Sequence, residues 1–141
     1  MASPRQRPEA ARRPGRRLVS SGGPWEELAG YSRAVVVGDS CWVSGTTDAG
    51  PDGRSLHPGD MAGQARAVLR IIELALRKGG FSLSDVVRTR MFVTDMARAS
   101  QAVAVHGEVF GHIRPAATLV EVARLIDDSL LIEIEAEARR A

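Results

Sequence analysis

The hydrophobic residues of this chain repeat with two different periods, and the order of these periods along the chain limits the folds that it can adopt. Apolar residues at every second position predict strands over 34–37, 41–44, 87–94, 117–125 and 130–138. Apolar residues at every third or fourth position predict helices over 60–78 and 96–113. Strands and helices do not alternate strictly, so the sequence predicts an α+β fold in which two helices pack on one sheet.

Capping and turn residues agree with the predicted boundaries of these helices and strands. The sequence Gly38-Asp39-Ser40 predicts the turn of a hairpin, Asp60 suits the N-cap of the first helix, and Gly79 ends that helix. The residues expected to face the core from the third strand and the second helix are Val87, Thr89, Met91, Val93, Met96, Ala99, Val103 and Phe110.

The other face of the predicted sheet also carries apolar residues. Phe92, Val120 and Val122 cannot all be covered by two helices that pack on the opposite face. A sheet face with uncovered apolar residues predicts that the protein associates with copies of itself.

The first 17 residues differ in composition from the rest of the chain. They contain six arginines and one glutamate, which leaves 13 basic and 16 acidic residues, a net charge of −3, for residues 18–141. We therefore expect a disordered basic tail over 1–17 and one folded domain over 18–141. The acidic domain makes nucleic acid an unlikely partner, because phosphate contacts require clustered basic residues.

The remaining composition restricts the compartment and the chemistry. Cys41 is the only cysteine, so no internal disulfide is expected. No apolar run approaches the ~20 residues that span a bilayer, and no apolar segment follows the N-terminal arginines. We expect a cytoplasmic protein without a membrane partner. Schiff-base chemistry would have to use Lys78, the only lysine, which lies at a predicted helix end and is better interpreted as a solvated charge.

Several motifs resemble one family over about residues 18–138. They are "GYSRAV", "WVSGTT", "QARAVLRIIELAL", "DVVRTRMFVTDM", "RPAATLVEVARL" and "IEIEAEA". The chain resembles the reactive-intermediate deaminase family, also called RidA, YjgF or L-PSP. The resemblance implies a chorismate-mutase-like α+β subunit with a mixed sheet, a homotrimer, and a ligand cleft between neighbouring subunits. Well-studied members hydrolyse imines and enamines, such as 2-iminopropanoate, to a keto acid and ammonia.

The resemblance also assigns site residues. Tyr31, Ser44, Gly45 and Glu133 match residues of the family's cleft, in which the glutamate positions or activates the attacking water. The arginine that binds the substrate carboxylate stands two residues after a proline in the family, and that position is Ala117 here. An arginine forms a two-pronged pair with a carboxylate, and losing one partner of such a pair typically costs ~2–5 kcal/mol. We therefore expect either another source of charge or a different substrate.

Other residues are candidates for that charge. Arg90 lies on a predicted strand, where it either faces the cleft or pairs with a glutamate of a neighbouring strand. Arg33 lies close to Tyr31, and Arg114 precedes the motif proline, although a loop arginine is commonly solvated. His106 titrates near neutrality and is either an acid–base group or a half-buried helix residue.

Hydroxyl groups near the motifs are further candidates for contacts with a neutral ligand. Thr46 follows Ser44-Gly45, and Thr118 follows Ala117 at the start of a predicted strand. Threonines at such positions are otherwise common strand formers. The three histidines show no spacing that is typical of a metal site, and no cofactor motif is present, so neither a metal nor a cofactor is expected.

Three functions remain open from the sequence. The first is an enzyme that hydrolyses or otherwise processes an imine, an enamine or a related carbonyl compound, but is not a standard 2-iminopropanoate deaminase. The second is a non-catalytic trimer that binds a ligand and acts as a regulator or a chaperone-like partner. The third is an endoribonuclease. The retained tyrosine and glutamate favour the first, and Ala117 favours the second.

Overall fold

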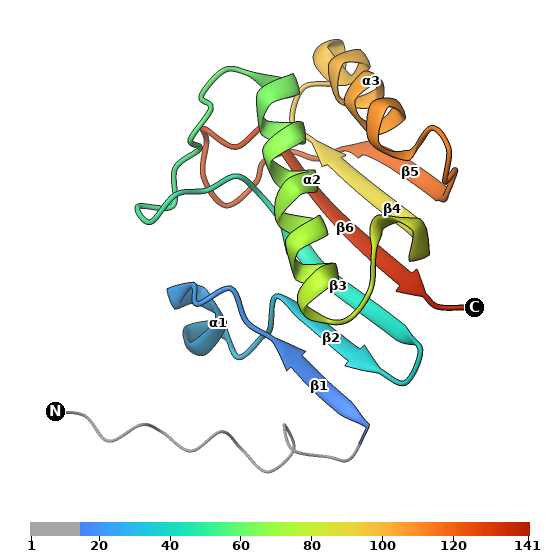
Figure 1. Cartoon of the computed structure of the whole chain (residues 1–141). Coiled ribbons are helices and arrows are strands. Elements are labelled where there is room, and N and C mark those ends of the chain that lie inside the picture. Colours follow the sequence, from blue (N-terminus) through green and yellow to red (C-terminus); the bar gives the residue numbers. More distant parts are fainter. Residues whose placement is uncertain (1–14) are drawn as a thin grey trace, which may run out of the picture.

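A computed structural model describes residues 15–141, which form one six-stranded mixed sheet with helices on one face (Figure 1). The strand order is β1-β2-β3-β6-β4-β5, and only the β4–β5 pair is parallel among the described strands. The predicted α+β fold is confirmed. The strands are β1 (Arg16–Val19), β2 (Ala34–Val37), β3 (Ser40–Thr46), β4 (Val86–Val93), β5 (Ala116–Glu121) and β6 (Ile132–Arg139).

The helices α2 and α3 lie side by side across the sheet, whereas the short α1 lies beside β1 and β2 (Figure 1). Their bounds are α1 (Pro24–Ala29), α2 (Met61–Lys78) and α3 (Ala99–Phe110), with 3-10 turns η2 (Leu83–Asp85) and η3 (Met96–Arg98). The N-cap of α2 is Asp60, whose side chain accepts a hydrogen bond from the Gly63 amide, as expected. Gly79 is the C-cap of α2.

The strand residues divide between the two faces as their alternation predicts. On β6, Ile132 and Ile134 are fully buried under the helices, whereas Glu133 lies on the opposite face and is only half-buried. We call that opposite side the open face. On β4, Thr89 and Met91 are buried on the helix face. The expectation for Val87 is wrong: a register shift between Val86 and Arg88 leaves Val87 48% exposed.

The open face carries apolar side chains that no described element covers. Trp42 is 46% exposed and Val120 is 41% exposed, and Phe92 is half-buried between them in the sheet order. The prediction of an uncovered apolar sheet face is therefore confirmed. By contrast, Met96 of η3 and Val103 of α3 were expected to face the core and are exposed, and the buried side of α3 is occupied by Ala102 and Val105.

The N-terminal boundary differs from the expected one. Arg16 and Arg17 begin β1 and pair with Val37 and Val36, and Arg17 donates a 2.7 Å hydrogen bond to the Gly79 carbonyl. The folded domain therefore begins before residue 18. The rest of the expected tail, residues 1–14, lies outside the described residues. No helix in the described range is both long and apolar enough to cross a membrane.

The buried thiol of Cys41 gives a first testable expectation. Cys41 is 0% exposed beneath the helices, and burial raises its pKa to about 11, so the thiol stays protonated at neutral pH. We expect a thiol-specific disulfide reagent at pH 8 to leave the folded protein unmodified and to modify one thiol per chain in denaturant. Rapid modification of the folded protein would show that this part of the core is open to solvent.

Candidate active site

Four residues that the sequence singled out meet where β2, β3 and β6 lie next to one another. Tyr31 follows Gly30, the left-handed C-cap of α1 with φ 73°, and Arg33 immediately precedes β2. Gly45 lies in β3 at an irregularity between Val43 and Thr46, and Glu133 is the second residue of β6. Residues that are about 100 positions apart in sequence are thus brought together by the antiparallel β3–β6 pair.

Hydrogen bonds fix the Tyr31 side of this cluster. Arg33 donates from Nη2 to the Gly45 carbonyl over 2.6 Å, and its guanidinium lies 5.8 Å from the centre of the Tyr31 ring. The Ser44 hydroxyl donates to the Ser32 carbonyl, also over 2.6 Å. Ser44 therefore positions the segment that carries Tyr31 and Arg33. The Tyr31 side chain remains 40% exposed and can be reached by a ligand.

The Glu133 carboxyl has the electrostatic environment of a group that can exchange a proton. Burial raises its pKa, the positive charge of Arg33 lowers it in part, and the neighbouring Glu135 raises it further. Burial also lowers the pKa of Arg33, against the attraction of Tyr31, Glu26 and Glu133. Raised carboxyl pKa values of this kind are typical of general bases and acids in enzyme sites.

The absence of a side chain at Gly45 makes room for Glu133. A Cβ atom at residue 45 would overlap the carboxylate of Glu133 and would lie 3.1 Å from its Cδ. Glu133 and Gly45 also line a hollow of about 240 Å³ on the open face, together with Phe92, Val122, Arg124, Leu125 and Glu135. This volume is below the roughly 300–1,000 Å³ of small-molecule sites, so one subunit offers only a shallow part of such a site.

We expect Gly45→Ala to impair the site without unfolding the protein. The added methyl group displaces the flexible end of Glu133, and a shift of about 1 Å at a catalytic group can lower turnover by ~100-fold. Gly107→Ala is the matched control, because no atom lies within 4 Å of the added Cβ in α3 and alanine favours the helix. Equal turnover of both variants and the wild type would show that the Gly45–Glu133 contact is not part of the site.

The structure does not place the other candidates in this cluster. Thr46 is 1% exposed and its hydroxyl donates to the Ser44 carbonyl, so a ligand cannot reach it. Arg90 lies on the open face and pairs with Glu137 at 3.0 Å and with Glu135 at 3.7 Å. The cross-strand pairing considered for Arg90 is therefore present. Thr118 is opposite Arg90 on the edge strand β5.

His106 of α3 and Ala117 of β5 both lie next to Thr89 of β4. The His106 Nε2 atom lies 2.8 Å from the Thr89 hydroxyl, and its ring packs on Phe110 with 4.7 Å between ring centroids. Burial lowers the pKa of His106. Ala117 is exposed and is the register partner of Thr89. Since Thr89 faces the helices, His106 and Glu133 lie on opposite faces of one subunit.

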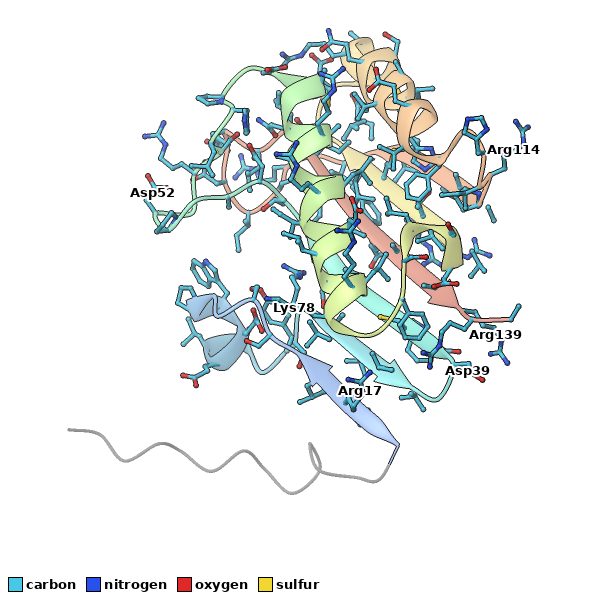
Figure 2. The ribbon with its side chains drawn as sticks, in the orientation of Figure 1. Arg17, Asp39, Asp52, Lys78, Arg114 and Arg139 are labelled. Carbon is cyan, nitrogen blue, oxygen red and sulfur yellow. The ribbon has the colours of Figure 1, made fainter. Side chains whose placement is uncertain are left out.

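Arg114 lies apart from this cluster, whereas Arg124, an arginine of the "RPAATLVEVARL" motif, lies next to it. Arg114 has a φ of 58° and extends beyond the end of α3 into solvent (Figure 2). Arg124 lines the hollow beside Glu133. Lys78 is exposed at the C-terminal end of α2, as expected (Figure 2).

The sequence did not indicate Glu26, whose negative charge acts on Arg33. Glu26 is 8% exposed, accepts a 3.1 Å hydrogen bond from the Ser21 amide, and contributes to the charge balance of Arg33. It lies on α1, which the hydrophobic periodicity did not predict because the helix has only six residues. Pro24 at its start and Gly30 at its end are the sequence signals from which this helix could have been predicted. Within 15–141, no group of three or more metal-binding side chains is found.

Comparison with known proteins gives matches over nearly the whole domain. The family model described as Endoribonuclease L-PSP matches residues 24–140. A RutC family protein of Pyrococcus horikoshii is 37% identical over 77% of this chain and 85% of its own length.

Solved structures agree with this match. Rv2704 of Mycobacterium tuberculosis, a member of the YjgF/YER057c/UK114 family, is 47% identical, with a TM-score of 0.81 over 89% of this chain and 99% of its own. The structure of E. coli TdcF with bound serine is 27% identical, with a TM-score of 0.71 over 88% of this chain and 94% of its own.

Proposed function

Since the chain belongs to the Endoribonuclease L-PSP family, which includes the RutC and YjgF proteins, we propose that it hydrolyses a small imine or enamine. The proposal rests chiefly on the Glu133 carboxyl. This group is half-buried, has a raised pKa, and lies beside Gly45 and close to Tyr31. Such a carboxyl can hold a water molecule against a carbon atom that is bound in the hollow.

The reaction balances with water as the only co-reactant. Glu133 takes a proton from water as the water oxygen attacks the imine carbon, the electron pair of the C=N double bond moves to nitrogen, and Glu133 passes its proton to that nitrogen, which gives a carbinolamine. Glu133 then takes the hydroxyl proton of the carbinolamine and delivers it to the amino nitrogen as the C–N bond breaks, which releases ammonia, leaves a carbonyl compound and restores the carboxylate. Tyr31 and the backbone near Gly45 position the ligand.

A cleft between subunits of a homotrimer would complete the site. The hollow beside Glu133 is shallow, and the open face around it carries uncovered apolar side chains such as Trp42 and Val120. Burying these side chains against a second copy would remove apolar surface from water and deepen the hollow. Ala117, Thr89 and His106 lie on the helix side of the sheet, opposite Glu133. The Glu133 of one subunit could therefore approach these residues only in a neighbouring copy.

The alanine at position 117 bears on the choice of function in two ways. Because Ala117 offers no charge, it argues against 2-iminopropanoate bound as in the family, with its carboxylate held by an arginine at this position. It also favours the second candidate function, a trimeric ligand binder without turnover. The endoribonuclease in the family's name is less well supported, since the domain after residue 17 has a net charge of −3.

An imine-hydrolysis assay tests the proposal. An amino-acid oxidase generates a series of 2-imino acids, and ammonia release is followed with and without the protein. We expect faster release than in the absence of protein for at least one member of the series. Ligand binding without acceleration would establish the binder, and cleavage of single-stranded RNA by a protein that is inactive on imines would establish the ribonuclease.

A further inference from the structure

Building on the proposed function, we propose that Arg33 is the anion-binding residue of this site and that the ligand is a carbonyl or imine compound with a carboxylate group. The charge that Ala117 lacks would thus come from a different element, the segment before β2, on the Tyr31 side of the cluster.

The hydrogen bonding of Arg33 leaves most of its donors available. A guanidinium has five N–H donors in a fixed fork. Among residues 15–141, Arg33 makes one side-chain hydrogen bond, from Nη2 to the Gly45 carbonyl. Its Nε has no partner there, but this atom is fully buried, so a ligand would have to contact the guanidinium through Nη1 or Nη2. Polar groups in such surroundings are nearly always paired, so the free donors of Arg33 beside a candidate site indicate a missing acceptor.

The charge of Arg33 is also incompletely balanced. In the described part of the chain no carboxylate lies within 4.0 Å of its guanidinium, whereas Arg90, which is also half-buried, has two such partners. Glu26 and Glu133 are close enough to favour the charged form of Arg33 without forming an ion pair. A half-buried cation of this kind costs free energy unless an anion pairs with it, and a ligand carboxylate would do so.

The geometry favours Arg33 over the other arginines. One end of its guanidinium is fixed by the Gly45 carbonyl, and Gly45 also contacts Glu133, so an anion held by Arg33 would lie near the carboxyl that orients water. The donors of Arg90 are directed to Glu135 and Glu137. Arg124 lines the same hollow but is exposed, and it is therefore the competing candidate.

Binding of two probes of nearly equal shape tests this assignment. Pyruvate and pyruvamide differ in charge, and their dissociation constants are measured by NMR titration for the wild type, Arg33→Gln, Arg33→Lys and Arg124→Gln. Arg70→Gln, at an exposed position of α2, is the control. Light scattering gives the assembly state of each variant.

We expect the wild type to prefer pyruvate by at least ~30-fold, because losing one partner of such a charge pair has an effect of this size. Arg33→Gln should remove the preference and keep pyruvamide binding, and Arg33→Lys should restore only part of it. Arg124→Gln should keep the preference for pyruvate, and Arg70→Gln should behave as the wild type does.

Other outcomes overturn the inference in distinguishable ways. If Arg33→Gln keeps the preference or Arg124→Gln removes it, Arg33 is not the anion-binding residue, while the proposed function stands. If Arg33→Gln changes only the assembly state, the missing acceptor belongs to another copy of the chain. If neither probe binds to the wild type, the proposed carbonyl site fails together with the inference.

Discussion

If the protein hydrolyses imines as proposed, we expect Glu133→Gln to lower the rate by at least about 100-fold and to leave the assembly state unchanged. The loss follows because glutamine cannot take a proton from water, and a positioned acid–base group contributes ~10²–10⁴-fold to a rate. The amide is nearly isosteric with the carboxyl, and Glu133 is only half-buried on the open face, so the fold should tolerate it. Turnover is measured by ammonia release, and assembly by light scattering.

The pH dependence of the wild type gives the same prediction a second readout. Glu133 acts as a base only when ionised, so turnover should fall as pH decreases through its pKa, which burial places above the usual value. Removing the positive charge of Arg33 raises that pKa further and should shift the fall to higher pH. Glu137→Gln, on the same strand and face, is the control and should keep the wild-type profile. A fully active Glu133→Gln protein would remove Glu133 from the mechanism.

We expect Gln64→Leu to lower the free energy of unfolding by about 2–5 kcal/mol, because it leaves several backbone groups without partners. Gln64 is 0% exposed in α2, and its amide joins three segments. Its Oε1 accepts from the Leu131 amide at 2.8 Å, and its Nε2 donates to the carbonyls of His57 and Ser129 at 3.1 and 3.0 Å. Domains of this kind have a total stability of only ~5–15 kcal/mol, so the effect is large.

Urea denaturation measures the change, with Gln101→Leu as the matched control. Gln101 lies on the exposed side of α3, so the same substitution should change stability by less than about 0.5 kcal/mol. Similar losses for both variants would show that the effect comes from the loss of glutamine itself and not from the Gln64 network. The network also fixes Leu131, which immediately precedes β6 and Glu133, so Gln64→Leu should impair turnover as well.

The strands and the long helices were predictable because the residues within each element show the hydrophobic period or the capping residues of that element. Glu133 and Ile134 alternate on β6 as the period of two requires, and α2 begins at a capping aspartate and ends at glycine. The faces were harder to predict where the backbone is irregular. Val87 lies at a register shift, and such a shift depends on the partner strand β6 rather than on the sequence of β4 itself.

The site was predictable only in part, because its geometry depends on contacts between distant residues. The family resemblance identified Tyr31, Gly45 and Glu133, which the structure brings together. It could not show that Arg33 binds the Gly45 carbonyl, or that Thr46 turns into the core. Those facts follow from the irregular pairing of β3 with β6, which no local pattern encodes.

A crystal structure of the protein with pyruvate, at a concentration that saturates binding in solution, tests the location of the site most directly. We expect pyruvate on the open face, with its carbonyl near Gly45 and Glu133 and its carboxylate on Arg33. Pyruvate bound instead at the β4–β5 edge, against Thr89 and His106 and away from Glu133, would contradict the assignment of Glu133, Gly45 and Arg33 as the reacting site.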